Sequence, residues 1–204
     1  AASDVYKRQI VDRCRLCYMS HNTNYILQQE LTAIAIGSLE KTTFSGEKLH
    51  IDPNLNYALS VAFTLTRMPP SDKLTPVEMM KLAAGEVAGE KSVKTLAEVI
   101  DQLNRETDIT KRFGQKGLGH RNLGRAIQIL LEKSETQEGK CMWAGDVFPA
   151  IESVILDYVQ DPNDRTKYLN DLKIAKSLYR ERIMTSIFNA YMDEPDAIQK
   201  DVMN

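Results

Sequence analysis

Residues 161–187 read DPNDRTKYLNDLKIAKSLYRERIMTSI, and this stretch decides the fold class. Asp161 can cap a helix, and Pro162 suits the first helical turn, where no backbone N–H donor is needed. Apolar side chains then recur every three or four positions, the period of one helix face. The stripe consists of Leu169, Leu172, Ala175, Tyr179, Ile183 and Ile187. The pattern predicts one long amphipathic helix.

Further helices are predicted towards the N-terminus by the same period. The strongest start is Thr75-Pro76-Val77-Glu78, a capping box with proline at the first helical position. Asp52 and Pro53 give a second start, and Pro69-Pro70 ends that helix. The expected helices cover 24–36, 53–68, 76–84, 92–104, 122–133 and 147–159. The class is therefore mainly α, with a bundle-like arrangement.

Residues 10–19 show the only strand-like pattern. Cys14, Leu16 and Tyr18 alternate with Arg13, Arg15 and Cys17, which is the period of a half-buried strand. A single strand cannot form a sheet, so we expect a strand remnant whose partners lie outside this chain, or an orphan segment.

Both ends suggest a piece of a longer protein. Residues 1–9 are set aside, because Ser3 to Gln9 resembles the translation of a transposon adapter met in metagenomic gene models. Pro195 could open a helix that is unfinished at Asn204.

The composition restricts the class of function. The 204 residues are 43% hydrophobic, and their net charge of -2 argues against a general nucleic-acid or membrane-surface binder. Three cysteines without framework spacing and the lack of a secretory signal indicate a reducing, cytoplasmic compartment. The apolar runs are far shorter than the roughly 20 residues that cross a bilayer, so no membrane segment is expected.

Three candidate motifs are weak. Residues 85–92 nearly match a phosphate-binding loop, but Glu90 stands where the second glycine is required. Cys14 and Cys17 could suggest zinc, yet a strand would point them to opposite faces, so no metal site is expected. Trp143 is interpreted as a packing residue. No nucleophile paired with a base stands out, so we assign no catalytic residue.

The stretch 109–131 is basic and contains no acidic residue. Its charged members are Lys111, Arg112, Lys116, Arg121 and Arg125, with His120 beside them. The glycine-rich turn at 117–119 leads into a helix, so backbone N–H groups, the positive helix end and Arg121 converge there. This arrangement predicts an anion site, above all for phosphate. The alternative is a simple turn followed by solvated arginines.

Several motifs carry a family resemblance in the same order. Val11-Asp12-Arg13, a strand ending at Tyr18, and Gln29-Glu30-Leu31 resemble the close of an AAA-type ATPase core in the PrkA serine protein kinase family. Residues 62–68 are similar to that family's Phe-x-x-Leu-Thr-Arg-Leu helix, and 74–86 to its next helix.

The resemblance continues into the basic stretch and beyond it. Gly117-Leu118-Gly119-His120-Arg121 is similar to the family's Gly-Ile-Ser-Pro-Arg, a sensor-2-like element whose arginine reaches the nucleotide phosphates. Gly119-His120 replaces Ser-Pro, which puts the rigidity of Arg121 in question. Residues 141–155 and 168–191 resemble the C-terminal helical domain of the same family.

This resemblance implies an ATP-dependent serine/threonine protein kinase with a protein substrate, and it allows a homo-oligomer. Residues 10–68 would end the ATPase module with its last strand and lid helices, and 69–204 would form a truncated C-terminal helical domain. ATP and Mg would be bound mainly upstream, so the fragment alone should be inactive. Arg121 would sense the γ-phosphate, with Gly117, Gly119 and His120 shaping its turn, and Arg13 would lie near the nucleotide or a subunit boundary.

Two other functions stay open from the sequence. Residues 111–125 could form a basic, helix-turn-helix-like element that grips the backbone of a nucleic acid. The chain could also be a structural adaptor without a ligand.

Overall fold

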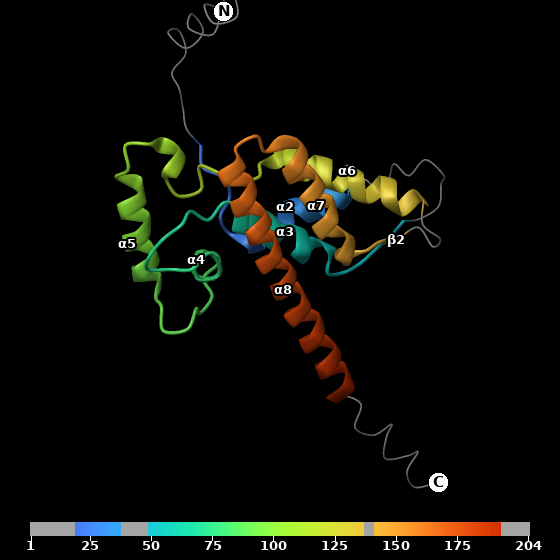
Figure 1. Ribbon diagram of the computed structural model, residues 1–204. Helices are drawn as coiled ribbons and strands as arrows, with labels where there is room; N and C mark the ends of the chain where they lie inside the picture. Colours follow the sequence, from blue (N-terminus) through green and yellow to red (C-terminus); the bar gives the residue numbers. More distant parts are fainter. Residues whose placement is uncertain (1–18, 38–48, 137–140, 193–204) are drawn as a thin grey trace, which may run out of the picture.

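The computed structural model describes residues 19–37, 49–136 and 141–192, and helices dominate these parts (Figure 1). The helices are α2 (Tyr25–Gly37), α3 (Leu55–Thr66), α4 (Pro76–Ala83), α5 (Val93–Asn104), α6 (His120–Thr136), α7 (Val147–Tyr158) and α8 (Pro162–Met192). Two short 3-10 helices, η1 (Ile109–Lys111) and η2 (Ala144–Asp146), lie before α6 and α7. The predicted mainly α class is confirmed. No described helix is both long and apolar enough to cross a membrane.

Helix α3 forms the centre of the core, packed by α2, α7 and α8. The predicted core residues Leu55, Leu59, Ala62 and Phe63 are all fully buried, as expected for a largely apolar helix. The helix begins later than predicted. Asp52 accepts the N–H of Asn54 at 2.8 Å through its side chain and that of Leu55 at 2.9 Å through its carbonyl. It therefore shapes the turn before the helix rather than capping it.

The start of α4 follows the predicted capping box. The hydroxyl of Thr75 accepts the N–H of Glu78, and the Glu78 carboxylate accepts the N–H of Thr75. The helix ends at Ala83, and Gly85 then adopts a φ of +81°. The near-match to a phosphate loop thus follows a capped helix, as the sequence indicated, and not a strand.

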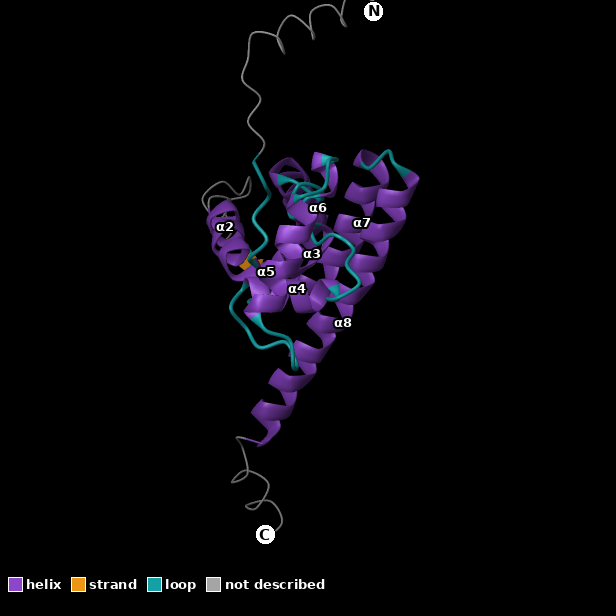
Figure 2. Cartoon of the chain, turned by 90° about the vertical axis from the view of Figure 1, so that its left-hand side faces the viewer, coloured by secondary structure: helices purple, strands orange, loops and turns teal. Residues whose placement is uncertain are grey.

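Helix α8 starts at Pro162, where the side chain of Asp161 accepts the N–H groups of Asn163 and Asp164 at 2.8 and 3.3 Å. Its predicted stripe is buried only in the first half, which contains Leu172 and Ala175. Ile187 is 58% exposed, because the second half of α8 extends beyond the other helices (Figures 1 and 2).

Two short strands were missed by the sequence patterns. Strands β1 (His50–Ile51) and β2 (Cys141–Met142) pair in parallel, with His50 opposite Cys141. Two residues are too few to display an alternating pattern. Trp143, which follows β2, is 52% exposed, so its interpretation as a packing residue was wrong. The predicted strand over 10–19 lies outside the described residues, apart from Met19.

Helix α2 is present as predicted, but its polar face points inward. The buried side chains are those of Tyr25, Gln28, Thr32 and Ile36. The apolar stripe noted in the sequence is exposed and contains Ile26, Leu27, Leu31 and the 71% exposed Ile34. The helix itself lies at the left-hand edge of Figure 2. The buried polar groups are used: Gln28 accepts a hydrogen bond from Arg67 at 2.7 Å, and Thr32 lies 3.4 Å from Ser60. Because buried polar groups require hydrogen-bond partners, these contacts favour the orientation of α2 in which Gln28 and Thr32 face the core.

Candidate functional site

The glycine-rich turn before α6 rests directly on the C-terminal end of α3. Gly117 has a φ of +127°, and a Cβ atom added to it would lie 2.6 Å from Cγ of Arg67. Only glycine fits such a backbone at such a distance. Leu118 is buried, and its N–H donates to the Thr66 hydroxyl at 3.1 Å while its carbonyl accepts from Nε of Arg67 at 3.0 Å. The turn is therefore fixed by its backbone groups.

Arg67 joins three segments that are distant in sequence. Its side chain is 4% exposed, and besides Leu118 it donates from Nη1 to the Asn22 carbonyl and to the Gln28 side chain, both at 2.7 Å. None of these three acceptors is a carboxylate. Burial lowers the pKa of Arg67 to about 10, so the guanidinium remains charged at neutral pH. Sequence reasoning did not assign this residue, although a basic side chain at the end of a largely apolar helical run was a visible signal.

Helix α6 begins immediately after the turn. The Gly119 carbonyl accepts the N–H groups of Asn122 and Leu123 at 3.1 and 3.2 Å, and the Asn122 side chain accepts the N–H of Gly119 at 3.0 Å. The helix starts at His120, two residues earlier than predicted, which places Arg121 in its first turn. Both His120 and Arg121 are exposed. Neither their side chains nor their backbone N–H groups have an acceptor among the described residues.

The other basic residues of the stretch do not converge with Arg121. Lys116 forms an ion pair with Asp164 at 3.0 Å, and Arg125 lies 3.9 Å from Glu132. Arg112 donates from Nε to the carbonyl of Glu106 at 3.2 Å. The stretch is therefore divided between the start of α6 and a separate cavity.

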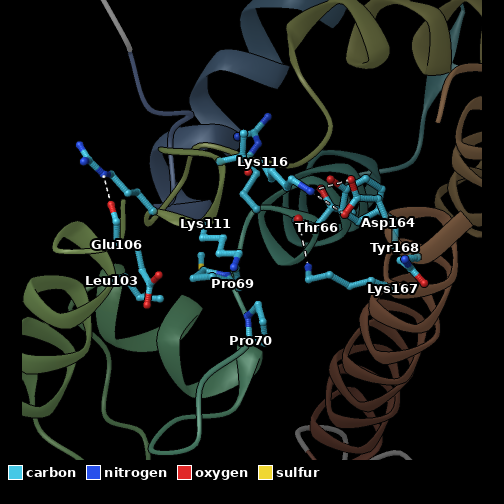
Figure 3. Close-up of a pocket in the computed structure, with 15 residues that line it drawn as sticks. Thr66, Pro69, Pro70, Leu103, Glu106, Lys111, Lys116, Asp164, Lys167 and Tyr168 are labelled. Carbon is cyan, nitrogen blue, oxygen red and sulfur yellow. Dashed lines mark hydrogen bonds and ion pairs between the residues drawn. The ribbon is translucent and has the colours of Figure 1, made fainter. Parts of the chain in front are cut away.

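This cavity, of about 420 Å³, lies between the end of α3, the η1 region and the first turns of α8 (Figure 3). Part of its wall is apolar and is formed by Met68, Pro69, Pro70, Leu103 and Tyr168. Lys111, Arg112, Lys116 and Lys167 also line it, together with the carboxylates of Glu106 and Asp164. Arg121 does not line it.

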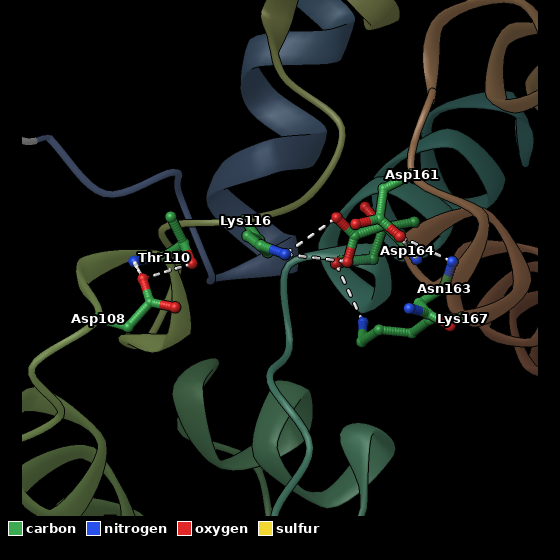
Figure 4. Close-up of polar contacts among 8 residues, drawn as sticks. Asp108, Thr110, Lys116, Asp161, Asn163, Asp164 and Lys167 are labelled. Carbon is green, nitrogen blue, oxygen red and sulfur yellow. Dashed lines mark hydrogen bonds and ion pairs between the residues drawn. The ribbon is translucent and has the colours of Figure 1, made fainter.

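Two of the lysines beside the cavity are held by α8 and α3 (Figure 4). Lys116 contacts both carboxylate oxygens of Asp164, at 3.0 and 3.1 Å. Lys167 donates to Asp171 at 2.8 Å and to the Thr66 carbonyl at 3.2 Å, so it also satisfies the C-terminal end of α3. Burial raises the pKa of Asp171, while Lys167 opposes the shift.

Two further titratable residues lie beside these features: Tyr168 lines the cavity, and His21 is bound to the segment before the turn. Burial raises the pKa of the Tyr168 hydroxyl to about 12, so it stays protonated. The backbone N–H of His21 donates to the Gly114 carbonyl at 2.7 Å. Burial, and secondarily the charge of Arg67, lower the pKa of the His21 imidazole.

The structure thus brings four of the predicted site residues together: Gly117, Gly119, His120 and Arg121 form one turn at the start of α6. The fifth, Arg13, lies outside the described residues. Among the residues that the structure describes, no cluster of three His, Cys, Asp or Glu side chains could hold a metal ion.

Comparison with known proteins gives one match. The family model described as PrkA serine protein kinase C-terminal domain matches residues 77–204, more than half of the chain. The matched part includes both the turn and most of the cavity wall. No curated protein and no solved structure matches.

Proposed function

Because the chain belongs to the PrkA serine protein kinase C-terminal domain family, we propose that it serves an ATP-dependent serine/threonine protein kinase that also carries an AAA-type ATPase module. In this proposal the described helices form the lid and the C-terminal helical part. Arg121 supplies a sensor-2-like positive charge to the phosphates of a nucleotide that the ATPase module binds.

The observation that carries the proposal is an unpaired arginine on a fixed turn. The Arg121 side chain has no hydrogen bond or ion pair within the described ranges, although most cations of the basic stretch do. Beside it, the backbone N–H groups of His120 and Arg121 are also free of protein acceptors there. Free N–H groups at a helix start together with an arginine fit a phosphate group.

The contacts of the turn support the proposal although Gly119-His120 stands in place of Ser-Pro. A glycine at this position would loosen an isolated turn. Here the backbone is held from both sides, by Thr66 and Arg67 at Leu118 and by Asn122 at Gly119. These contacts hold the backbone in front of Arg121 without a proline, which supports the proposed role.

Arginine suits this task for two physical reasons. It keeps its charge at any physiological pH and offers a planar fork of donors that matches phosphate oxygens. A charge held in place before the reaction stabilises the negative charge on the transferring phosphoryl group without a cost of reorganisation. ATP would supply the phosphoryl group, with Mg bound to its phosphates by the ATPase module. Arg13 would lie near the nucleotide or a subunit boundary.

The proposal is tested by ATP turnover in a protein that carries both the ATPase module and this chain. Arg121→Ala should lower turnover about 10-fold or more, since one preorganised donor to a transition state contributes roughly that much. Arg121→Lys should recover only part of the loss, because it restores the charge but not the fork.

Arg180→Ala is the matched control, because Arg180 is an exposed helical arginine without an ion pair in the described structure. Its turnover should equal that of the unaltered protein. If Arg121→Ala behaves like this control, Arg121 does not act on the nucleotide.

A further inference from the structure

The cavity beside the turn is lined by basic and apolar residues that have no role in the proposed nucleotide contact of Arg121. It is lined by the end of α3 with Pro69 and Pro70, by the region around η1, and by the first two turns of α8 (Figure 3). Its volume of about 420 Å³ lies within the range of ligand sites, and such sites combine apolar walls with a few polar groups.

The positive charges of the cavity are only partly neutralised. Lys116 is paired with Asp164, and Lys167 with Asp171. Lys111 and Arg112 form no ion pair within residues 19–37, 49–136 and 141–192. The Nε of Arg112 is bound to the Glu106 carbonyl, which holds the guanidinium while leaving its two terminal nitrogens without an acceptor in that part of the chain.

The charges near these two cations leave a surplus. Glu106 is the one lining carboxylate without an ion pair in the described part, and it is exposed. Arg67, which also lines the cavity, adds a further positive charge, and none of its acceptors is a carboxylate. The exposed Asp108, whose pKa Lys111 helps to lower, lies nearby as well. Lys111, Arg112 and Arg67 therefore face the two exposed carboxylates of Glu106 and Asp108, and the remaining positive charge favours an anion.

The apolar wall restricts what the anion can be attached to. Met68 and Tyr168 are buried, while Pro69 and Leu103 are half-buried and Pro70 is exposed. These side chains offer a surface to a carrier group next to the cations. A free inorganic ion would leave this surface in water.

We propose that this cavity binds a phosphate monoester, with the phosphate held by Lys111 and Arg112 and an apolar carrier packed on Pro69, Pro70 and Leu103. A phosphate monoester carries a charge of about -1.5 to -2 at neutral pH and three acceptor oxygens, which match the ammonium of Lys111 and the open donors of Arg112. Either a phosphorylated protein side chain or a small phosphorylated metabolite provides this chemistry. The site is independent of the nucleotide contact of Arg121.

The test is calorimetric titration of the 204-residue chain with phenyl phosphate. We expect saturable one-to-one binding, and inorganic phosphate should bind about 5-fold more weakly because it lacks the apolar carrier. A phosphoserine peptide forms the second arm: tighter binding than phenyl phosphate assigns a protein segment as the source, and weaker binding assigns a small molecule. No nucleotide is present, so failure here leaves the proposed role of Arg121 unaffected.

The double variant Lys111→Gln with Arg112→Gln should weaken phenyl phosphate binding about 10-fold or more, because both charge-assisted contacts are lost. The matched control is Lys94→Gln with Arg180→Gln, which removes the same charge from two exposed residues that do not line the cavity. Thermal melting followed by circular dichroism checks that both proteins are folded. Absence of saturable binding up to about 10 mM ligand, or equal loss in both double variants, overturns the proposal.

Discussion

Nε of Arg67 donates a hydrogen bond to the carbonyl oxygen of Leu118 at 3.0 Å, across 51 positions of sequence. The same guanidinium reaches Asn22 and Gln28, so one buried side chain connects the region before α2, α2 itself and the turn that presents Arg121. The position of Arg121, which we propose to contact phosphate, therefore depends on a buried residue of another segment.

Removal of the Arg67 head group should destabilise the fold strongly. Arg67→Met keeps the apolar stem but leaves the acceptors of Leu118, Asn22 and Gln28 without their donor, and we expect a loss of about 3 kcal/mol in the free energy of unfolding. Urea denaturation of the 204-residue chain measures it. Arg182→Met, which removes an arginine that stacks on Tyr57 at 4.2 Å on the exposed side of α8, should cost far less. Equal losses would contradict the role of Arg67 as the connecting residue.

A methyl group at Gly117 should also be costly. Gly117→Ala places its Cβ 2.6 Å from Arg67 and forces a positive φ on a side chain, so the free energy of unfolding should fall by about 2 kcal/mol. Gly124→Ala is the matched control in α6, where the added Cβ meets nothing within 4 Å. That substitution should stabilise the chain by about 0.5 to 1 kcal/mol, because alanine is the better helix former. The same denaturation series records both, and opposite signs are expected.

The N-caps of the neighbouring helices α4 and α5 should contribute differently to the free energy of unfolding. Thr75→Ala removes a reciprocal capping box, and we expect a loss of about 1 kcal/mol in the free energy of unfolding. Ser92 occupies the equivalent position before α5, but its side chain makes no capping hydrogen bond. Ser92→Ala should therefore have the smaller effect in the same measurement, and a larger effect than that of Thr75→Ala would contradict the described caps.

His21 should make stability depend on pH. Its folded pKa is lowered from the ordinary value of 6.5, by burial and then by Arg67. Below pH 6.5 the unfolded chain binds a proton that the folded chain resists, so stability is lost as pH falls through the unfolded pKa and is fully present above it. His21→Gln should flatten the change in melting temperature between pH 7 and 5. An unchanged slope in this variant would assign the pH dependence to other groups, but not to Asp171, whose raised pKa stabilises the fold as pH falls.

The isolated chain should not bind DNA. Lys116 and Arg125 are already paired with carboxylates, and the net charge is -2. A fluorescence-anisotropy titration with duplex DNA at low salt should therefore remain flat. Saturable binding that weakens steeply with salt would instead support the nucleic-acid alternative.

The sequence predicted those features that depend on local signals. The capping box at Thr75 and the Asp161-Pro162 start act within one helical turn, so their outcome can be predicted without tertiary structure. The helical period of α3 and the first half of α8 likewise follows from which side chains avoid water.

Features set by distant partners could not be predicted in this way. Helix α2 buries Gln28, whose side-chain oxygen accepts a hydrogen bond from Arg67. The sequence of α2 alone gives no sign of this distant donor. The two strands owe their existence to the pairing of His50 with Cys141, far away in sequence. Within the site, the turn was found from its glycines and arginine, whereas Arg67 was missed because its three partners lie in other segments.

Helix α8 connects the cavity with a part of the chain that projects past the other helices. Its first turns form one wall of the cavity through Asp164, Lys167 and Tyr168, while its far end projects past the other helices (Figure 1). At 1.5 Å per residue, the distance from Tyr168 to Met192 is about 36 Å, so a tilt of about 10° at the cavity displaces the tip by about 6 Å. Any tilt of the helix at the cavity would therefore change what its far end can touch.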